Sequence, residues 1–235
     1  MPTDKFSARP IGVVRSVPPY PSQKSLLDKP YSPACDRNRE PILALLRELF
    51  QDRREVLEIG SGTGQHAVYF AGKLPQLTWQ TSDLANNLAG IRIWLNEAGL
   101  ANTPPPMEFD VNLTWPDRRF DAIFSANTLH IMAWPEVEKM FAGLPKVMTE
   151  SARLVIYGPF NIGGQFTSES NASFDASLKA RNPEQGIRDR EAVIALAEQR
   201  NLKLLADVEM PAHNRCLVWE YCAERLGVTP GLDQS

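Results

Sequence analysis

The feature that most constrains this sequence is a run of alternating glycines between an apolar stretch and a segment with helical periodicity. Residues 56–66 read Val-Leu-Glu-Ile-Gly-Ser-Gly-Thr-Gly-Gln-His. This order predicts a strand, a tight loop and the start of a helix. Glycine is needed in such a loop because a Cβ would obstruct both the turn of the backbone and the approach of a ligand. The run therefore predicts a cofactor bound at the end of the strand.

The spacing of the glycines indicates which cofactor. Gly60, Gly62 and Gly64 alternate, whereas the dinucleotide fingerprint Gly-x-Gly-x-x-Gly would need its third glycine where this chain has Gln65. Glu58 precedes the loop within the strand, where a carboxylate repels a pyrophosphate and attracts an amine or a sulfonium. The Glu-x-Gly-x-Gly-x-Gly pattern resembles the first motif of class I S-adenosylmethionine-dependent methyltransferases. The resemblance implies S-adenosylmethionine as the cofactor.

Length and composition limit the kinds of protein this chain can be. A chain of 235 residues is long enough for one α/β domain with a large core. The formal net charge is -3, from 25 Lys and Arg against 28 Asp and Glu, and no segment concentrates basic residues, so we expect no nucleic-acid partner. The three cysteines lack C-x-x-C spacing, which fits a reducing compartment. Because the first 25 residues lack an apolar signal core and no run approaches the length of a membrane span, we expect a cytoplasmic protein without a membrane partner.

The N-terminal part of the chain differs in composition from the rest. Seven of the 19 prolines fall within residues 1–34, which predicts an extended or disordered Pro-rich arm. A single domain is expected over residues 35–235. Asp36 is expected to cap its first helix, with Pro41 in the first turn. The arm is either a flexible tail or a cover over the mouth of the pocket.

The rest of the sequence alternates between strand-like and helix-like patterns. Strands are expected at 56–59, 77–81, 107–109, 122–124 and 154–157, and helices near 65–73, 85–98, 135–148 and 189–200. Such alternation implies a parallel sheet that is covered on both faces. Two final strand-like runs, 202–209 and 215–222, are joined by a short turn and must be antiparallel to one another. We therefore expect an α/β fold with a doubly wound, mostly parallel seven-stranded sheet and a C-terminal antiparallel hairpin, as in Rossmann-like class I methyltransferases.

In open α/β sheets, ligands bind beyond the carboxyl ends of the strands. Asp83 follows the second expected strand, where its carboxylate can accept hydrogen bonds from ribose hydroxyls, and Leu84 comes next. Asp110 follows the third, where it can accept from an adenine amino group while the backbone of Val111 faces the base. Aspartate also commonly ends strands and caps helices, so each position alone fits a structural role equally well.

The segment after the fourth expected strand should face the transferable methyl group. It contains Asn127 and His130 and lacks the Asn/Asp-Pro-Pro-aromatic motif of many base-modifying and glutamine-modifying methyltransferases. The histidine is a candidate general base because its unperturbed pKa lies near 6.5. It fits equally well a structural histidine that binds a backbone carbonyl.

Further motifs lie on both sides of the central strands. They are Asp36-Arg37-Asn38-Arg39-Glu40-Pro41-Ile42, Tyr157-Gly158-Pro159-Phe160-Asn161, Ser170-Asn171, Phe174-Asp175, the run from Ala180 to Asp189, and Met210-Pro211-Ala212-His213-Asn214. Over roughly residues 34–222 the chain resembles the methyltransferase-like 26 family and its bacterial relatives. The resemblance implies the class I fold and S-adenosylmethionine, and that family has no generally assigned substrate. An arginine at position 37 can hold a carboxylate of the cofactor or of the substrate.

The loop, the strand ends and the resemblance together define the expected site. The expected cofactor-binding residues are Arg37, Asn38, Glu58, Gly60, Ser61, Gly62, Gly64, His66, Asp83, Leu84, Asp110, Val111 and Asn127. The expected catalytic residues are His130, Asn127 and Asp175, and the expected substrate-binding residues are Tyr157, Asn161, Asn171, Arg181 and His213. We expect no metal.

The stretch from 158 to 188 is too long and too patterned for an ordinary crossover. It contains Gly163-Gly164, so it is expected to be an insertion that closes over a small-molecule substrate as a lid. The alternative is a rigid surface loop whose phenylalanines fill the core. Closure would favour methyl transfer by in-line displacement, which depends on alignment and desolvation.

Two other functions compete with methyl transfer. One is a catalytically silent scaffold that retains the cofactor pocket and binds a partner through the Pro-rich arm. The other is an NAD-dependent oxidoreductase, which Gln65 and Glu58 disfavour. The sequence assigns neither the acceptor atom nor an oligomeric state.

Overall fold

The computed structural model describes residues 29–223. Most of the expected arm, residues 1–28, therefore lies outside the described residues, as do residues 224–235. The elements are α1 (Pro33–Leu49), β1 (Glu55–Ile59), α2 (Gln65–Lys73), β2 (Thr78–Asp83), η2 (Ala85–Asn87), α3 (Leu88–Ala98), β3 (Met107–Glu108), β4 (Phe120–Ala126), α4 (Trp134–Val147), β5 (Met148–Asn161), α5 (Glu169–Arg181), β6 (Arg188–Asp189), α6 (Arg190–Glu198), β7 (Leu202–Met210) and β8 (Asn214–Tyr221). No helix in this part of the chain is long and apolar enough to span a membrane.

The strands form one sheet in the order β3-β2-β1-β4-β5-β8-β7, and β6 pairs with the far end of β5. The pairs β2/β3, β1/β2, β1/β4 and β4/β5 are parallel. The pairs β5/β8 and β7/β8 are antiparallel. The predicted doubly wound sheet with a C-terminal antiparallel hairpin is therefore confirmed. This order places β1 and β4 side by side at the centre, where the strand order reverses and ligands bind in this class of fold.

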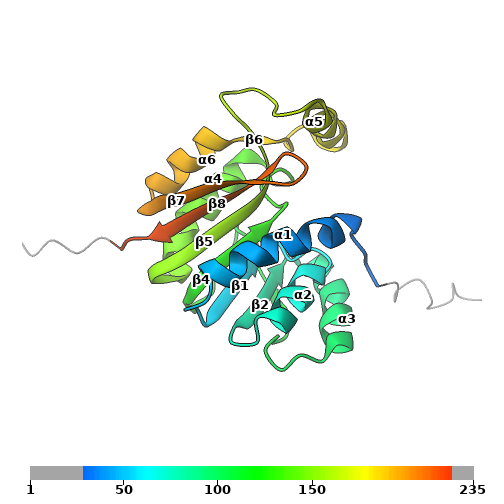
Figure 1. The fold of residues 1–235 in the computed structure, drawn as a ribbon, viewed down its shortest axis with the longest axis vertical. Coiled ribbons are helices and arrows are strands. Elements are labelled where there is room, and N and C mark those ends of the chain that lie inside the picture. Colours follow the sequence, from blue (N-terminus) through cyan, green and yellow to red (C-terminus); the bar gives the residue numbers. More distant parts are fainter. Residues whose placement is uncertain (1–28, 224–235) are drawn as a thin grey trace, which may run out of the picture.

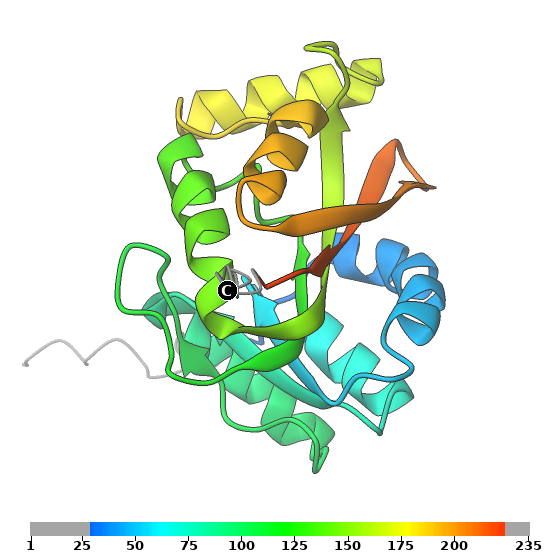
Figure 2. The same ribbon diagram turned by 90° about the vertical axis from the view of Figure 1, so that its left-hand side faces the viewer.

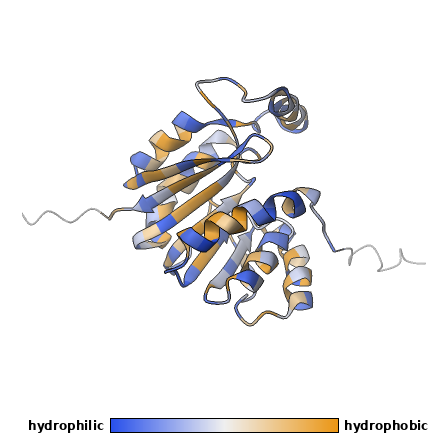
Figure 3. Ribbon diagram, in the orientation of Figure 1, coloured by the Kyte–Doolittle hydropathy of each residue, from blue (hydrophilic) through white to orange (hydrophobic). Residues whose placement is uncertain are grey.

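Helices cover both faces of the sheet (Figures 1 and 2). Helices α1, α2 and α3 lie on one face, and α4 and α6 lie on the other. Each face has its own apolar core, one containing Phe70, Trp79 and Phe124 and the other containing Phe141 and Trp219. The central strands are correspondingly apolar, whereas α5 lies away from both cores and is largely hydrophilic (Figure 3). The sheet is thus rigidly packed, and its carboxyl edge is where the chain forms a site.

The first helix begins earlier than predicted. It starts at Pro33, Asp36 lies in its first turn, and Pro41 lies inside the helix. The predicted capping role of Asp36 is therefore wrong. Proline suits a helix start because its ring presets φ and its missing donor has no helical partner there. The early start carries Arg37 and Asn38 onto the first two turns, facing the end of the sheet.

Two elements of the α5 region depart from the expected pattern. Strand β5 extends over 14 residues, far beyond the predicted 154–157. The apolar pattern missed its first half, because that half is polar and includes Ser151 at φ 59°. Helix α5 was expected only as part of an irregular insertion. Two of its three buried side chains, Asn171 and Asp175, are polar, so it lacks the apolar stripe that periodicity detects. Ser168 caps it by accepting from the Asn171 N–H.

Candidate functional site

A cavity of about 1290 Å³ opens at the carboxyl ends of the central strands. Its walls come from α1, the glycine loop, the ends of β2, β4 and β5, and α5. It brings together residues that the sequence predicts for the site: Arg37, Asn38, Gly60, Ser61, Gly62, His66, Asp83, Leu84, Asp110, Val111, Asn127, His130, Tyr157 and Asn171. The space exceeds that of most single-ligand pockets, so it has room for a nucleoside cofactor and a second small molecule.

The glycine loop satisfies its own backbone donors. The N–H groups of Gly60 and Ser61 both donate to the carbonyl of Ser82, at 3.0 Å each. Gly60 has φ 76°, and a Cβ there would lie 2.7 Å from the side chain of Thr128. Gly62 donates to Oδ2 of Asp83 at 2.7 Å. With these donors committed inside the protein, the loop is poorly suited to cradle a pyrophosphate, which needs several unbonded N–H groups.

Gly64 has a different role from the one expected. It lies outside the cavity lining, with φ 89°, at the cap of α2. A Cβ there would lie 3.2 Å from the backbone of Ile91 in α3. The third glycine therefore permits close packing of two helices, and the structure does not bring it to the cavity where its contact with the cofactor was expected.

The carboxylate of Asp83 is held between the glycine loop and the next turn. Besides the bond from Gly62, its Oδ1 accepts from the Leu84 N–H at 2.8 Å and from Nδ2 of Asn87 at 2.7 Å. Asn87 lines the cavity as well and was missed by the sequence analysis. Its position four residues after the aspartate was the available signal. The carboxylate is thus fixed at the edge of the cavity with its oxygens oriented by three donors.

Glu58 lies behind the loop and does not line the cavity. Its Oε2 accepts from Oγ of Ser61 at 2.9 Å and from Nε1 of Trp79 at 3.1 Å. Burial raises the pKa of this carboxyl group to about 7. Glu58 therefore shapes the loop from beneath, and its attraction of a ligand cation stays a prediction.

A buried histidine and an amide form the wall contributed by α1 and α2. Nε2 of His66 lies 2.7 Å from Oδ1 of Asn38, and the imidazole stacks on Phe70. Burial lowers the pKa of His66 to about 4, so the ring is uncharged at neutral pH. In the tautomer that carries the proton on Nε2, the ring donates to the Asn38 oxygen, which leaves the Asn38 amide donors for another partner.

Asn127 and His130 lie in the loop that follows β4 and meet near Gly158. A Cβ built on Gly158 would lie 3.9 Å from Oδ1 of Asn127 and 3.9 Å from Nδ1 of His130. Asn127 adopts φ 57°, a conformation that asparagine tolerates better than most residues. His130 is 6% exposed and packs edge-on against the ring of Phe174, with centroids 5.2 Å apart. Burial lowers the pKa of His130 to about 4, with smaller contributions from Arg188 and Arg181.

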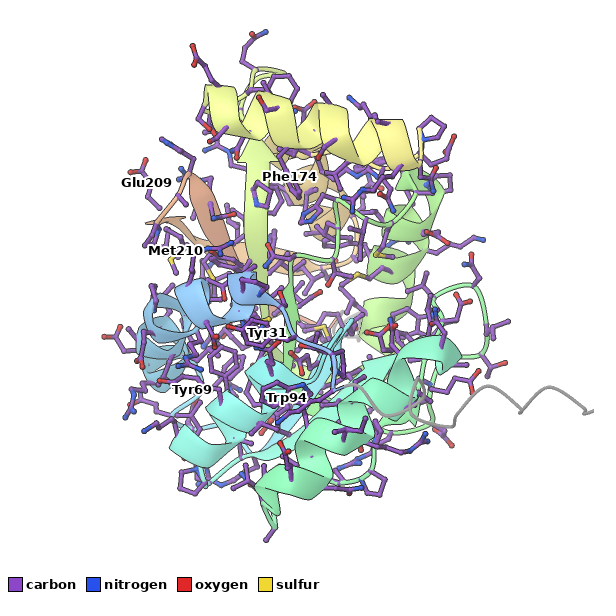
Figure 4. All side chains as sticks on the ribbon, turned by 90° about the vertical axis from the view of Figure 1, so that its right-hand side faces the viewer. Tyr31, Tyr69, Trp94, Phe174, Glu209 and Met210 are labelled. Carbon is purple, nitrogen blue, oxygen red and sulfur yellow. The ribbon has the colours of Figure 1, made fainter. Side chains whose placement is uncertain are left out.

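The residues on the two sides of the cavity come from distant elements (Figure 4). Phe174 extends from α5 on one side, and Tyr31 and Trp94 lie on the other. A segment we call the strap, residues 29–32, crosses α3 there, and its Pro30 and Ser32 line the cavity. The carbonyl of Pro30 accepts from Nε1 of Trp94 at 2.7 Å. The N–H of Ser32 donates to the side chain of the first residue of α2 at 2.5 Å, so the strap is tied at both ends.

Six expected site residues lie outside the cavity lining: Glu58, Gly64, Asn161, Asp175, Arg181 and His213. Asp175 is 4% exposed and accepts from the Ile187 N–H at 2.8 Å while pairing with Lys179, so the structure shows it as a structural acceptor and brings no support to its expected role as a base. Asn161 is partly buried beside β6, whereas Arg181 and His213 are exposed. The positions of these side chains depend on contacts between residues far apart in the sequence, which no local sequence pattern predicts.

The structure matches solved proteins of one fold class. The TM-score is 0.70 at 16% identity with an O-methyltransferase family protein from Burkholderia thailandensis, over 81% of this chain and 58% of that chain. It is 0.68 at 16% identity with an O-methyltransferase family 2 protein from Planctomyces limnophilus DSM 3776 in complex with apigenin, over 78% and 56%. It is 0.67 at 17% identity with PigF with SAH, over 77% and 54%. The chain thus spans little more than half the length of these proteins, and the similarity shows the fold.

The chain therefore has the Rossmann-like fold of class I methyltransferases. A family model described as "Protein of unknown function (DUF938)" matches residues 29–221. The chain belongs to this family.

Proposed function

We propose that this protein is an S-adenosylmethionine-dependent methyltransferase that acts on a small-molecule acceptor. The observation that carries the proposal is that one cavity is lined both by the glycine loop with Asp83 and by Asn127 with His130. The first pair suits a nucleoside, and the second suits a nucleophile that must lose a proton. The O-methyltransferase neighbours with the same fold support this assignment.

The residues of the cofactor half fit S-adenosylmethionine. Gly60 and Gly62 line the cavity, and a Cβ on Gly62 would meet no atom within 4 Å, so the loop backbone there is accessible to a ligand. The oriented carboxylate of Asp83 suits ribose hydroxyls, and Asp110 with Val111 suits the adenine. Arg37 is exposed on the cavity wall, and within residues 29–223 it forms no ion pair with a carboxylate, so it is suited to the carboxylate of the cofactor. The neighbour solved with SAH agrees with this choice of cofactor.

When bound, S-adenosylmethionine supplies an electrophilic methyl group on a sulfonium. The residues of the acceptor half then have two tasks. Asn127 and Tyr157 orient the acceptor, whose apolar part packs against Phe174. His130 accepts the proton of the acceptor, because its ring is uncharged at neutral pH and lines the cavity.

The finer assignments follow from the same proposal. We place the chain with the methyltransferase-like 26 family, in the cytoplasm, and without a nucleic-acid partner. We assign residues 158–188 to the wall of the acceptor site. Within this segment Asn171 lines the cavity, so we count it among the acceptor-site residues.

Calorimetric titration with S-adenosylhomocysteine, with NADH as the comparison ligand, tests the cofactor. We expect micromolar binding of S-adenosylhomocysteine alone. Asp83→Ala should weaken it about 10-fold or more, because three donors and the ribose lose their acceptor, and Asp83→Asn should weaken it less. Unchanged affinity in Asp83→Ala would refute the site, and saturable NADH binding would favour an oxidoreductase.

Turnover requires a separate test. The protein would be incubated with labelled S-adenosylmethionine and panels of phenols, thiols and amines, including apigenin. Methylation of at least one acceptor class, lost in His130→Gln, would support the enzyme. Tight binding of the cofactor with no turnover across all the panels would favour the catalytically silent scaffold.

A further inference from the structure

The loop after β4, residues 129–132, carries His130 and is held by a single segment, residues 182–188. All four carbonyls of the loop accept hydrogen bonds from this segment. The bonds are Arg188 Nε to Leu129 O at 3.1 Å, Gly186 N to His130 O at 3.0 Å, Gln185 Nε2 to Ile131 O at 3.1 Å, and Arg188 Nη2 to Met132 O. The segment therefore supplies donors that would otherwise have to come from water.

Arg188 is the main contributor to this contact. Its guanidinium reaches two carbonyls of the loop and also donates to the carbonyl of Glu184 at 2.9 Å. Within residues 29–223 it forms no ion pair with a carboxylate. The fork of an arginine can span carbonyls in this way, whereas a lysine ammonium acts as a point charge. This arginine is thus used to hold backbone.

Asp175 fixes the segment in turn. Its Oδ1 accepts from the Ile187 N–H at 2.8 Å, and its Oδ2 pairs with Lys179 at 2.6 Å. Gly186 lies against the same carboxylate with φ 155°, and a Cβ there would lie 2.9 Å from Oδ1. The close approach explains why this position is a glycine. A connected path therefore runs from α5 through the segment to the loop that carries His130.

The same helix also touches the histidine from the cavity side. Phe174, the residue before Asp175, packs its ring edge-on against the imidazole. The backbone of His130 is thus held from behind by the segment, and its ring is held in front by α5. These two contacts leave the ring little freedom to rotate or to become hydrated.

We propose that Asp175, Gly186 and Arg188, here called the clamp, are positioning residues that hold the His130 ring in the acceptor end of the cavity. The clamp acts through the backbone of residues 129–132 and does not touch the acceptor. The proposal rests on the proposed function, because it concerns the base of that reaction. It assigns a role to the motif at residues 180–189, which the cavity lining leaves unexplained.

The test uses the full chain without an acceptor. The chain has three histidines, so their ring signals in a proton–carbon NMR spectrum are assignable from single His→Gln variants. Arg188→Lys keeps the charge but cannot bridge Leu129 and Met132. We expect it to displace the His130 ring signals and to speed diethyl pyrocarbonate modification of His130 several-fold, while His66 is unchanged in both measurements. Arg200→Lys, at an exposed arginine after α6, is the matched control and should change neither.

A second variant separates positioning from folding. Asp175→Asn keeps an acceptor for the Ile187 N–H and loses the charge pair, so it should affect His130 less than Asp175→Ala does. Calorimetry with S-adenosylhomocysteine on each variant should show unchanged affinity, because the cofactor half lies apart from the clamp. If the NMR chemical shifts of the His130 ring are the same in Arg188→Lys as in the wild type, the proposed positioning role of the clamp is wrong. Equal changes at His66 and His130, with a parallel loss of cofactor affinity, would also overturn it by indicating general loosening. Failure of the wild type to bind S-adenosylhomocysteine would instead refute the proposed function and leave the NMR result valid.

Discussion

The two halves of the cavity are built in different ways. The cofactor half is formed largely by one stretch, from β1 through the loop to Asp83 and Asn87, whose contacts join neighbouring parallel strands. The acceptor half gathers Asn127 and His130 from the loop after β4, Tyr157 from β5 and Asn171 from α5. The first is local in sequence and held by backbone geometry, whereas the second depends on long-range packing. On the proposed function, the residues expected to hold the cofactor follow a sequence motif, whereas those expected to hold the acceptor come together only in the folded chain.

The largest loss of cofactor affinity is expected when a side chain is added at Gly60. Gly60→Ala would combine an unfavourable φ with a Cβ 2.7 Å from Thr128, so S-adenosylhomocysteine affinity should fall about 100-fold. Gly62→Ala carries a similar φ in open space and should cost only about fivefold. Adding Thr128→Ala to Gly60→Ala should recover part of the loss. Equal losses of affinity in the two glycine variants, measured by calorimetry, would show that the close approach of Gly60 to Thr128 does not determine cofactor binding.

In the acceptor half, His130→Gln should lower kcat about 100-fold while S-adenosylhomocysteine affinity stays unchanged. Gln cannot take a proton, although it preserves a polar side chain of similar reach. His213→Gln should leave kcat unchanged, because that residue is exposed and outside the lining. If kcat and S-adenosylhomocysteine affinity both fall in His130→Gln, the acceptor half and the cofactor half do not act independently.

Glu58 makes the stability of the cofactor half depend on pH. Its pKa is raised by burial from 4.5 to about 7, so the folded state binds more protons than the unfolded state between these values. This contribution makes stability fall as pH rises through that window. Glu58→Gln removes the penalty, so its unfolding free energy relative to wild type should increase from pH 5 to pH 8, by at most about 3 kcal/mol. Urea unfolding at the two values checks this, and a relative loss at pH 8 would show that the ionised carboxylate is the stabilised form.

The smallest effect is expected at the strap. A Cβ at Gly90 would lie 2.6 Å from Pro30, so Gly90→Ala should displace the strap and weaken S-adenosylhomocysteine binding about threefold, a cost below 1 kcal/mol. Alanine should meanwhile favour the helix by about 1 kcal/mol. Gly72→Ala is matched, because its Cβ would make an ordinary 3.7 Å contact with Leu100. Identical cofactor affinity in both variants would mean that the strap does not complete the site.

The cofactor half was largely predictable from the sequence, for local reasons. The bounds of α2 agree with the predicted 65–73, and Asp83 is the last residue of β2, at the carboxyl end of that strand. The exceptions, Glu58 and Gly64, are residues whose direction depends on which face of the strand or helix is turned inward. The alternation of glycines predicts a loop but does not say which of them faces the ligand.

The acceptor half was less predictable because its contacts join residues far apart in sequence. Periodicity missed α5, since Asn171 and Asp175 occupy buried positions where apolar residues would mark a helix. The pairing of Asp175 with the Ile187 N–H, and of Arg188 with the loop after β4, has no sequence pattern. A carboxylate that resembled a base is consequently a structural acceptor.

The position of α5 between β5 and β6 determines which part of the chain could change without disturbing the sheet. The helix and the segment that follows it form one uninterrupted stretch of chain, and β6 returns to the end of the strand from which the stretch departs. Replacing or lengthening that single stretch would rebuild the acceptor wall without altering the strands that hold the glycine loop. On the proposed function, a change confined to this one stretch of chain would therefore be enough to change the acceptor.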